Sequence, residues 1–225
     1  SASRALQREF AARGAGWLSA ERLTIHGRGM TLAIDSHAGR CELTAPLLGE
    51  FNADNLLCAL GLLLSADLSL ADAARALESA GAPTGRMETF ATADRPLAVV
   101  DYAHTPDALA KALRAVRVHC AGRVTVVFGC GGDRDAGKRP LMGAVAAELA
   151  DSVVLTDDNP RSESPARIVA DIQQGLPAGH AAKVIHDRAA AILAALAAAG
   201  PPDAVLIAGK GHEDYQIVGN QRRAF

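Results

Sequence analysis

Two patterns of hydrophobic and polar positions divide the chain. Between residues 22 and 44 apolar and polar residues alternate, and glycines separate the alternating runs. This period of two is typical of strands with one buried face, so we expect two or three short antiparallel strands. Two helices are expected to follow, over 52–66 and 70–80. Glycines and a proline then interrupt the pattern, and we place a domain boundary near Gly85.

Beyond that boundary, short aliphatic runs alternate with helix-like stretches. The aliphatic runs suit strands that are buried on both faces; they are 97–101, 124–129, 152–156, 183–186 and 204–209. Helix starts are indicated by Thr105 before Pro106, by Ser164 before a second proline, and by Pro140. Strands that alternate with helices predict an α/β fold with a mostly parallel, Rossmann-like sheet.

Composition excludes several classes of protein. The 225 residues fit one large domain or two small ones, and 49% hydrophobic with 21% charged residues is a globular balance. Lys and Arg number 23 against 25 Asp and Glu, so we expect neither nucleic acid nor an anionic membrane as partner. No apolar run is long enough for a membrane span, and we expect no signal peptide, since no basic, apolar and small-residue series is present at the start. The four cysteines form no C-x-x-C pair, so we expect reduced thiols, a cytoplasmic protein and no metal site.

Polar clusters directly follow the predicted strands. They are DYAH (101–104), GCGGDR (129–134), TDDNPR (156–161) and GKGHE (209–213). Because the carboxyl ends of parallel strands meet at one edge of a sheet, we expect these clusters to share that edge. Open α/β sheets bind their ligands there.

The glycines of 129–132 resemble a nucleotide loop without matching one. Arg134 stands where a G-x-G-x-x-G motif needs glycine. Gly132, Gly137 and Lys138 approach a Walker motif, but Arg139 replaces the Ser or Thr that holds Mg²⁺. We reject both motifs; the remaining alternative is a flexible strand-to-helix turn.

The DNPR segment favours an amino-acid ligand. Arg161 can pair with a carboxylate bidentately, while Asp158 and Asn159 can accept from an ammonium group. The alternative is an Asx-turn that ends in Pro160. Farther along, Gly209 allows close backbone approach, and Glu213 is expected as a negative charge near the arginines; a solvated turn is the alternative.

Residues near the boundary are candidates for nucleotide contacts. Arg86 could clamp a phosphate and Asp101 could accept from ribose hydroxyls, although a salt bridge between domains explains them as well. Asn52 and Asn55 lie three residues apart, on one face of the expected helix. They are either capping residues or adenine contacts.

Taken together, these segments resemble the Mur ligases. The matching motifs are GEFNADN (49–55), GRMETF (85–90), VVDYAHTPDAL (99–109), VFGCGGDRDAGKRPLMG (127–143), TDDNPRSESP (156–165) and AGKGHEDYQ (208–216). Within the family they resemble the enzymes that add meso-diaminopimelate to UDP-N-acetylmuramoyl-L-alanyl-D-glutamate. The resemblance implies an ATP- and Mg²⁺-dependent ligation through an acyl phosphate, in a monomer.

The resemblance also assigns roles to residues. It implies a diaminopimelate pocket made of Arg134, Asp158, Asn159, Pro160, Arg161, Gly209 and Glu213. The arginines would hold the distal carboxylate, which lysine lacks, and Glu213 with the Gly209 carbonyl would hold the distal ammonium. It implies nucleotide contacts from Asn52, Asn55, Arg86, Asp101 and His104.

The resemblance covers the carboxyl-terminal half of such an enzyme. Residues 1–84 correspond to the tail of the ATPase-type central domain and 85–225 to the amino-acid-binding domain, with 81–85 as a hinge. The P-loop, most of the Mg²⁺ site and the domain for the uridine nucleotide have no counterpart here, so we expect a fragment without catalytic residues of its own. Alternatives are a diaminopimelate-binding module without turnover and a nicotinamide-dependent oxidoreductase, which the failed G-x-G-x-x-G motif disfavours.

Overall fold

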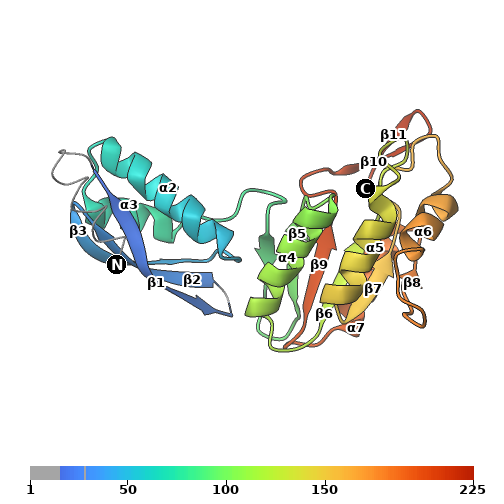
Figure 1. Ribbon diagram of the computed structural model, residues 1–225, viewed down its shortest axis with the longest axis horizontal. Helices are drawn as coiled ribbons and strands as arrows, with labels where there is room; N and C mark the ends of the chain where they lie inside the picture. The colour runs from blue at the N-terminus through green and yellow to red at the C-terminus, as the bar shows by residue number, and fades with distance from the viewer. Residues whose placement is uncertain (1–15, 28) are drawn as a thin grey trace. The chain divides into compact units, whose positions relative to one another are not determined.

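The computed structural model describes residues 16–27 and 29–225. The chain divides into two compact units between Gly81 and Ala82. The first unit contains β1 (Leu18–His26), β2 (Gly29–Ser36), β3 (Gly39–Ala45), α2 (Phe51–Ser65) and α3 (Leu70–Glu78). The second contains β4 (Glu88–Phe90), β5 (Leu97–Asp101), α4 (Pro106–His119), β6 (Val124–Phe128), α5 (Lys138–Leu149), β7 (Ser152–Leu155), α6 (Pro165–Gln173), β8 (Lys183–Val184), α7 (Arg188–Ala198), β9 (Ala204–Ala208), β10 (Tyr215–Val218) and β11 (Gln221–Ala224) (Figure 1).

In the part that the structure describes, the first unit is an antiparallel sheet with two helices. Its strands follow the order β1-β2-β3, which confirms the alternating pattern. Met30, Leu32 and Ile34 alternate along β2 with side chains at most 2% exposed, and Leu56 and Leu60 of α2 are also buried. The buried side chains of β2, which are every second residue, and those of α2, which lie one helical turn apart, form the core of this unit.

The second unit is built on a six-stranded sheet in the order β4-β5-β9-β6-β7-β8. The strands from β5 to β8 in that order are parallel, and only β4 is antiparallel to its neighbour. The predicted mostly parallel α/β fold is therefore confirmed. Each aliphatic run became a strand; β5 has the predicted bounds and the others end one or two residues earlier.

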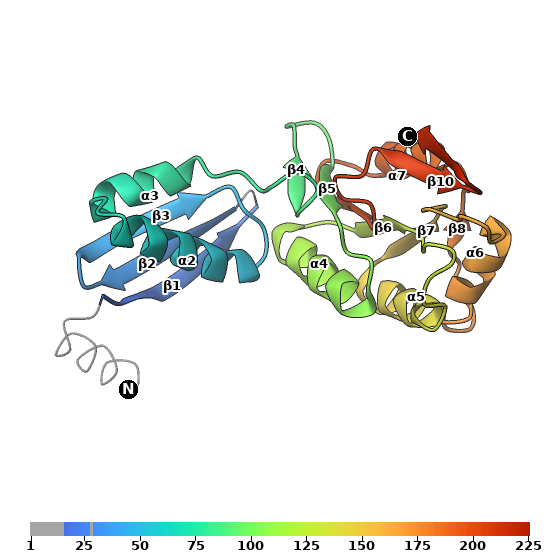
Figure 2. The same cartoon turned by 90° about the horizontal axis from the view of Figure 1, so that it is seen from above.

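Helices cover both faces of this sheet. Figure 2 shows α4 and α5 on one face and α7 on the other. On the α7 face, Val127, Val205 and Ile207 pack with Ala191 and Ala195 of the helix. All five residues of β9 are buried, as expected for a central strand of a parallel sheet.

Helix starts agree with the sequence only in part. The Thr105 side chain accepts from the N–H of Ala108, and a proline opens α4. Ser164 precedes α6, but its side chain makes no capping bond. The prediction at Pro140 is wrong: α5 begins at Lys138, so Pro140 is its third residue. Proline is tolerated there because N–H groups in the first turn have no partner within the helix.

The hairpin of β10 and β11 and the short strand β4 were not predicted. The hairpin holds the DNPR loop in place: the N–H of Arg161 donates to the carbonyl of Ile217 (3.0 Å), and the N–H of Gly219 donates to the carbonyl of Arg161 (2.8 Å). A polar loop after β7 thus gains a β-bridge at Arg161.

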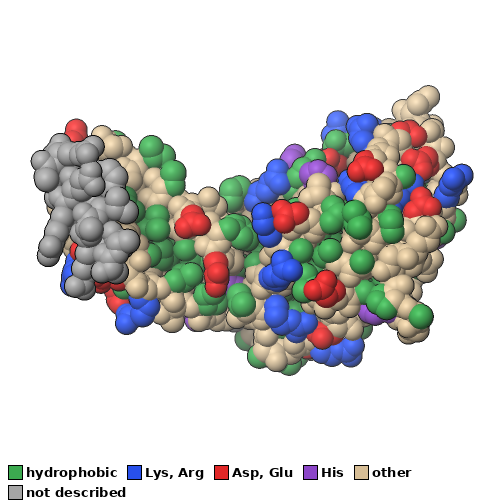
Figure 3. Space-filling view, in the orientation of Figure 1, with side chains coloured by type: hydrophobic (Ala, Val, Ile, Leu, Met, Phe, Trp, Pro, Cys, Tyr) green, Lys and Arg blue, Asp and Glu red, His purple; other side chains and the backbone are tan. Residues whose placement is uncertain are grey.

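The described helices are all too short or too polar to cross a membrane. On the face drawn in Figure 3, acidic and basic side chains are interspersed over the second unit.

Candidate functional site

Three neighbouring strands carry the residues predicted for the amino-acid pocket. β9, β6 and β7 are adjacent in the sheet, and their parallel carboxyl ends lead into the loops 209–214, 129–137 and 156–164. These loops contain Arg134, Asp158, Asn159, Pro160, Arg161, Gly209 and Glu213. The structure therefore brings all seven to one edge of the sheet.

Asn159 lies at the centre of this edge and is 5% exposed. Its Oδ1 accepts from Lys210 Nζ (3.0 Å) and from the N–H of Ile217 (2.9 Å), and its Nδ2 donates to Glu213 Oε2 (3.1 Å). Its backbone carbonyl accepts from the N–H of Gly132 (2.9 Å). The side-chain oxygen of Asn159 is thus already engaged by Lys210 and Ile217, so it orients these neighbours and has no lone pair left for a ligand's ammonium group.

Lys210 is a site residue that sequence reasoning missed. Its side chain is 3% exposed, and Nζ lies 3.0 Å from Glu213 Oε2 and 4.0 Å from Asp158 Oδ1. Among the described residues, Lys210 is the ion-pair partner of Glu213. From the sequence, we expected Glu213 to lie near the arginines instead. The sequence feature that could have indicated Lys210 is its position between two glycines, directly after the aliphatic run 204–208.

Glu213 is ionised in this environment. Burial by itself would raise the pKa of its carboxyl, but hydrogen bonds from Lys210 and Asn159 outweigh burial and lower the pKa below its usual value. Both of these bonds reach Oε2. Oε1 is consequently the oxygen available to a ligand.

Arg134 and Arg161 approach each other at Gly131. A Cβ at Gly131 would lie 2.9 Å from Arg161 Nη1 and 3.6 Å from Arg134 Cγ. Arg161 has a positive φ of 51°, and its Nη1 donates to the carbonyl of Gly132 (2.8 Å). The Arg161 guanidinium and the stem of the Arg134 side chain thus lie beside the same side-chain-free position, and the Arg134 guanidinium donates to the carbonyl of Asp133 (3.2 Å). Two arginines on neighbouring loops are residues that can pair with a carboxylate.

The glycines of the 129–132 segment serve loop packing. A Cβ at Gly129 would collide with the carbonyl oxygen of Thr156, and one at Gly132 with that of Pro160. The two glycines thus allow the loops after β6 and β7 to lie against each other. This packing explains the glycine run without a phosphate ligand.

Arg139 supports the same pair of loops and is 1% exposed. It forms a bidentate pair with Glu163 (2.8 and 2.9 Å) and bonds to Asp171 Oδ2 (2.8 Å) and to the carbonyl of Gly131 (3.2 Å). The Arg139 guanidinium lowers the pKa of Glu163 to about 2. Arg139 therefore makes a structural ion pair at the position where a Walker motif would bind metal.

The predicted nucleotide contact Asp101 is engaged by backbone groups. Its Oδ2 accepts from the N–H of Met87 (2.9 Å) and its Oδ1 from the N–H of Ala103 (2.8 Å). It fastens the segment before β4 to the end of β5. Each oxygen retains a lone pair, since a carboxylate offers about four acceptor sites.

Arg86 and His104 meet at Tyr102, which sequence reasoning did not select. The Arg86 guanidinium carbon lies 4.4 Å from the centre of the Tyr102 ring. The rings of His104 and His212 lie 4.7 and 5.6 Å from it, edge-on and stacked respectively. The exposed Arg86 charge is held in place by this cation–π contact.

Asn52 and Asn55 belong to the first unit. Asn55 Nδ2 donates to Asn52 Oδ1 (2.9 Å), which confirms that they share a helix face. Asn52 Nδ2 donates to the carbonyl of Leu48 (2.7 Å). The capping alternative is wrong, because α2 begins at Phe51 with Glu50 at the N-cap.

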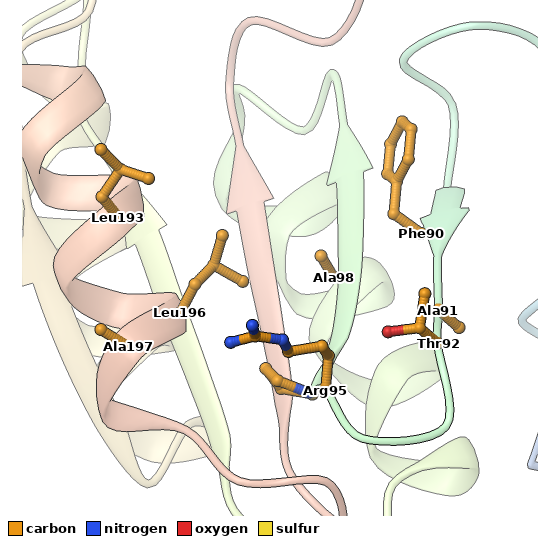
Figure 4. A pocket seen from close by; sticks show the side chains of 9 residues that line it. Phe90, Ala91, Thr92, Arg95, Ala98, Leu193, Leu196 and Ala197 are labelled. Carbon is orange, nitrogen blue, oxygen red and sulfur yellow. The ribbon is translucent and has the colours of Figure 1, made fainter.

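An apolar pocket of about 440 Å³ lies elsewhere on the second unit. It is lined by residues of the β4–β5 segment and of α7, including Phe90, Leu193 and Leu196 (Figure 4). Arg95 is its one charged lining residue. It therefore lacks the paired charges that a zwitterionic ligand needs. Within residues 16–27 and 29–225, His, Cys, Asp and Glu form no group suited to a metal ion.

Comparison with known proteins gives the family. The model of the Mur ligase, glutamate ligase domain matches residues 85–211, and the chain belongs to the Mur ligase family. A structure of UDP-N-acetylmuramoyl-L-alanyl-D-glutamate–2,6-diaminopimelate ligase is 42% identical, with a TM-score of 0.72 over 92% of this chain and 43% of that one.

Two more distant structures share the fold alone. UDP-N-acetylmuramate–alanine ligase from Thermotoga maritima is 22% identical, with a TM-score of 0.64 over 88% of this chain and 43% of that one. Folylpolyglutamate synthase from Mycobacterium tuberculosis is 20% identical, with a TM-score of 0.67 over 92% of this chain and 50% of that one. The chain thus spans half or less of the length of each of these proteins.

Proposed function

We propose that this chain is the amino-acid-binding part of an ATP-dependent ligase that joins meso-diaminopimelate to UDP-N-acetylmuramoyl-L-alanyl-D-glutamate. One observation carries the proposal: two arginines beside Gly131 and the acidic residues Asp158 and Glu213 lie on adjacent strand-end loops. Asn159 links these loops, because its side chain bonds to Glu213 and its backbone carbonyl accepts from Gly132. The ligase named for diaminopimelate, at 42% identity over nearly all of this chain, supports the choice of substrate.

The charges match one end of diaminopimelate. Arg134 and Arg161 face its distal carboxylate, which a guanidinium binds through two parallel hydrogen bonds. Asp158 and Oε1 of Glu213 accept from the distal ammonium group. L-Lysine offers the ammonium group alone, so the arginines would remain unpaired on binding it. The site thereby selects diaminopimelate, and it orients the other amine for amide formation.

The nucleotide contacts form a second part of the proposal. When bound, ATP supplies the phosphoryl group that activates the D-glutamyl carboxylate. Arg86, held on Tyr102 with its charge exposed, fits a phosphate, and His104 lies beside it. Asp101 fits a ribose hydroxyl only through its remaining lone pairs, and we keep Asn52 and Asn55 as adenine contacts. The described residues do not fit a Mg²⁺ centre.

Calorimetric titration of the 225-residue chain tests the substrate. We expect heat of binding with meso-diaminopimelate and at least tenfold weaker binding of L-lysine, because each charge-assisted hydrogen bond contributes about 1.5–3 kcal/mol. Equal affinities for the two amino acids would contradict the role of the arginines. Absence of binding to both would contradict the pocket in this chain.

A further inference from the structure

Lys210 has no role in the proposed recognition of diaminopimelate, yet it lies inside the site. Its ammonium group is buried and donates to Asn159 Oδ1 and Glu213 Oε2, each at 3.0 Å. The ring of Tyr215 lies 5.4 Å from Nζ. Burial of an ammonium group is costly unless it is paired and hydrogen-bonded. The presence of a buried lysine in this site therefore calls for a physical explanation.

A charge count gives that explanation. Asp158 and Glu213 together carry two negative charges, and Lys210 lies within 4.0 Å of both. Without the lysine, Glu213 would lose a hydrogen bond that lowers the pKa of its carboxyl, because an opposite charge favours the ionised form. Asp158, Glu213 and Lys210 together carry one net negative charge. That charge is matched by a single ligand ammonium group.

The other charged groups around this cluster are few. Arg188 of α7 is 1% exposed and lies close enough to stabilise Asp158 and Glu213 electrostatically. His212 acts on Glu213 in the same direction. Arg188 has no carboxylate at ion-pair distance among the described residues; its Nη2 donates to the carbonyl of Ala208 (2.8 Å). Lys210 is therefore the direct counter-ion of the carboxylate pair.

We propose that Lys210 is a positioning residue for recognition of the ligand's ammonium group, an inference that rests on the proposed function. Lys210 fixes the Asn159 amide and holds Glu213 by Oε2. It thereby leaves Oε1 of Glu213, in the same cluster as Asp158, for the ammonium group of the ligand. The lysine acts through these neighbours and does not touch the substrate.

The test compares Lys210→Met with the wild-type chain and with Lys111→Met, a control at an exposed lysine of α4. We expect Lys210→Met to bind meso-diaminopimelate about tenfold more weakly at pH 7, because the charge-assisted hydrogen bond between Glu213 and the ligand's ammonium group is weakened. Wild-type affinity should be flat between pH 6 and 8, whereas that of the variant should rise with pH as Glu213, no longer paired with a lysine, loses its proton. A purely structural role would not change the pH profile.

A second readout needs no ligand. Titration of the Glu213 carboxyl carbon by NMR, assigned with Glu213→Gln, should show a higher pKa in Lys210→Met than in the wild type. If Lys210→Met does not fold, Lys210→Gln, which keeps a donor and removes the charge, serves for the same comparison.

The two hypotheses fail separately. An unchanged pKa of Glu213 together with an unchanged pH profile would overturn the role of Lys210 while leaving diaminopimelate binding intact. Loss of diaminopimelate binding in the wild type would overturn the proposed function, and the carboxyl titration would still decide whether Lys210 controls Glu213.

Discussion

Replacement of Arg161 by alanine is expected to weaken meso-diaminopimelate binding by about 100-fold, the equivalent of roughly 2.7 kcal/mol. The guanidinium lies against Gly131, next to Arg134, and one of its nitrogens is already fixed by the carbonyl of Gly132. It is thus oriented before the ligand arrives, so little entropy is lost on binding. Calorimetric titration gives the affinity.

Arg161→Lys separates charge from geometry. An ammonium group cannot reproduce the bidentate contact, so we expect it to recover only a small part of the affinity. Arg223→Ala, at an exposed arginine of β11, is the matched control and should bind as the wild type does. If Arg161→Ala binds diaminopimelate with wild-type affinity, the carboxylate site lies elsewhere.

Arg139→Met is expected to lower the free energy of unfolding by about 3 kcal/mol, as loss of one partner of a buried ion pair does. The variant loses both bonds to Glu163, the bond to Asp171 and the bond to Gly131. Because Glu163 and Asp171 are about a quarter exposed, water compensates part of their lost contacts. Urea unfolding followed by circular dichroism measures the change.

Two further variants, one conservative and one a surface control, test this prediction. Arg139→Lys should recover only part of the loss, since an ammonium group has three donors and cannot reproduce the four bonds of Arg139 or its planar bidentate pair with Glu163. Arg114→Met, at an exposed position of α4, should change stability by less than about 0.5 kcal/mol. A comparably small change for Arg139→Met would show that the network does not stabilise the loops.

The architecture of the second unit followed from local patterns. Five aliphatic runs became parallel strands, and the polar residues after them met at one edge, because strand direction alone determines where those residues lie. The helix at Pro140 was misplaced since proline is acceptable at several positions of a first turn. The β10–β11 hairpin was missed although the Gly219-Asn220 pair between Val218 and Gln221 is a local turn signal. Its bridge to Arg161 is a tertiary contact, which sequence spacing does not reveal.

Within the site, residue types were predictable but partners were not. Asp158, Asn159 and Glu213 were recognised from their chemistry. That Asn159 is saturated by Lys210 and Ile217 depends on which loops become neighbours, which sequence spacing does not reveal. Lys210 was missed for a related reason: lysine is usually exposed, and its burial here requires two acceptors supplied from different segments.

The most direct test of the central claim is to map where diaminopimelate binds. We predict that titration of the isotope-labelled chain shifts the backbone amide signals of 129–134, 156–161 and 209–213, the loops after β6, β7 and β9. Signals from the apolar pocket around Phe90 and Leu193 should stay in place. Shifts confined to that pocket, or to the first unit, would contradict an amino-acid site at the carboxyl edge of the sheet.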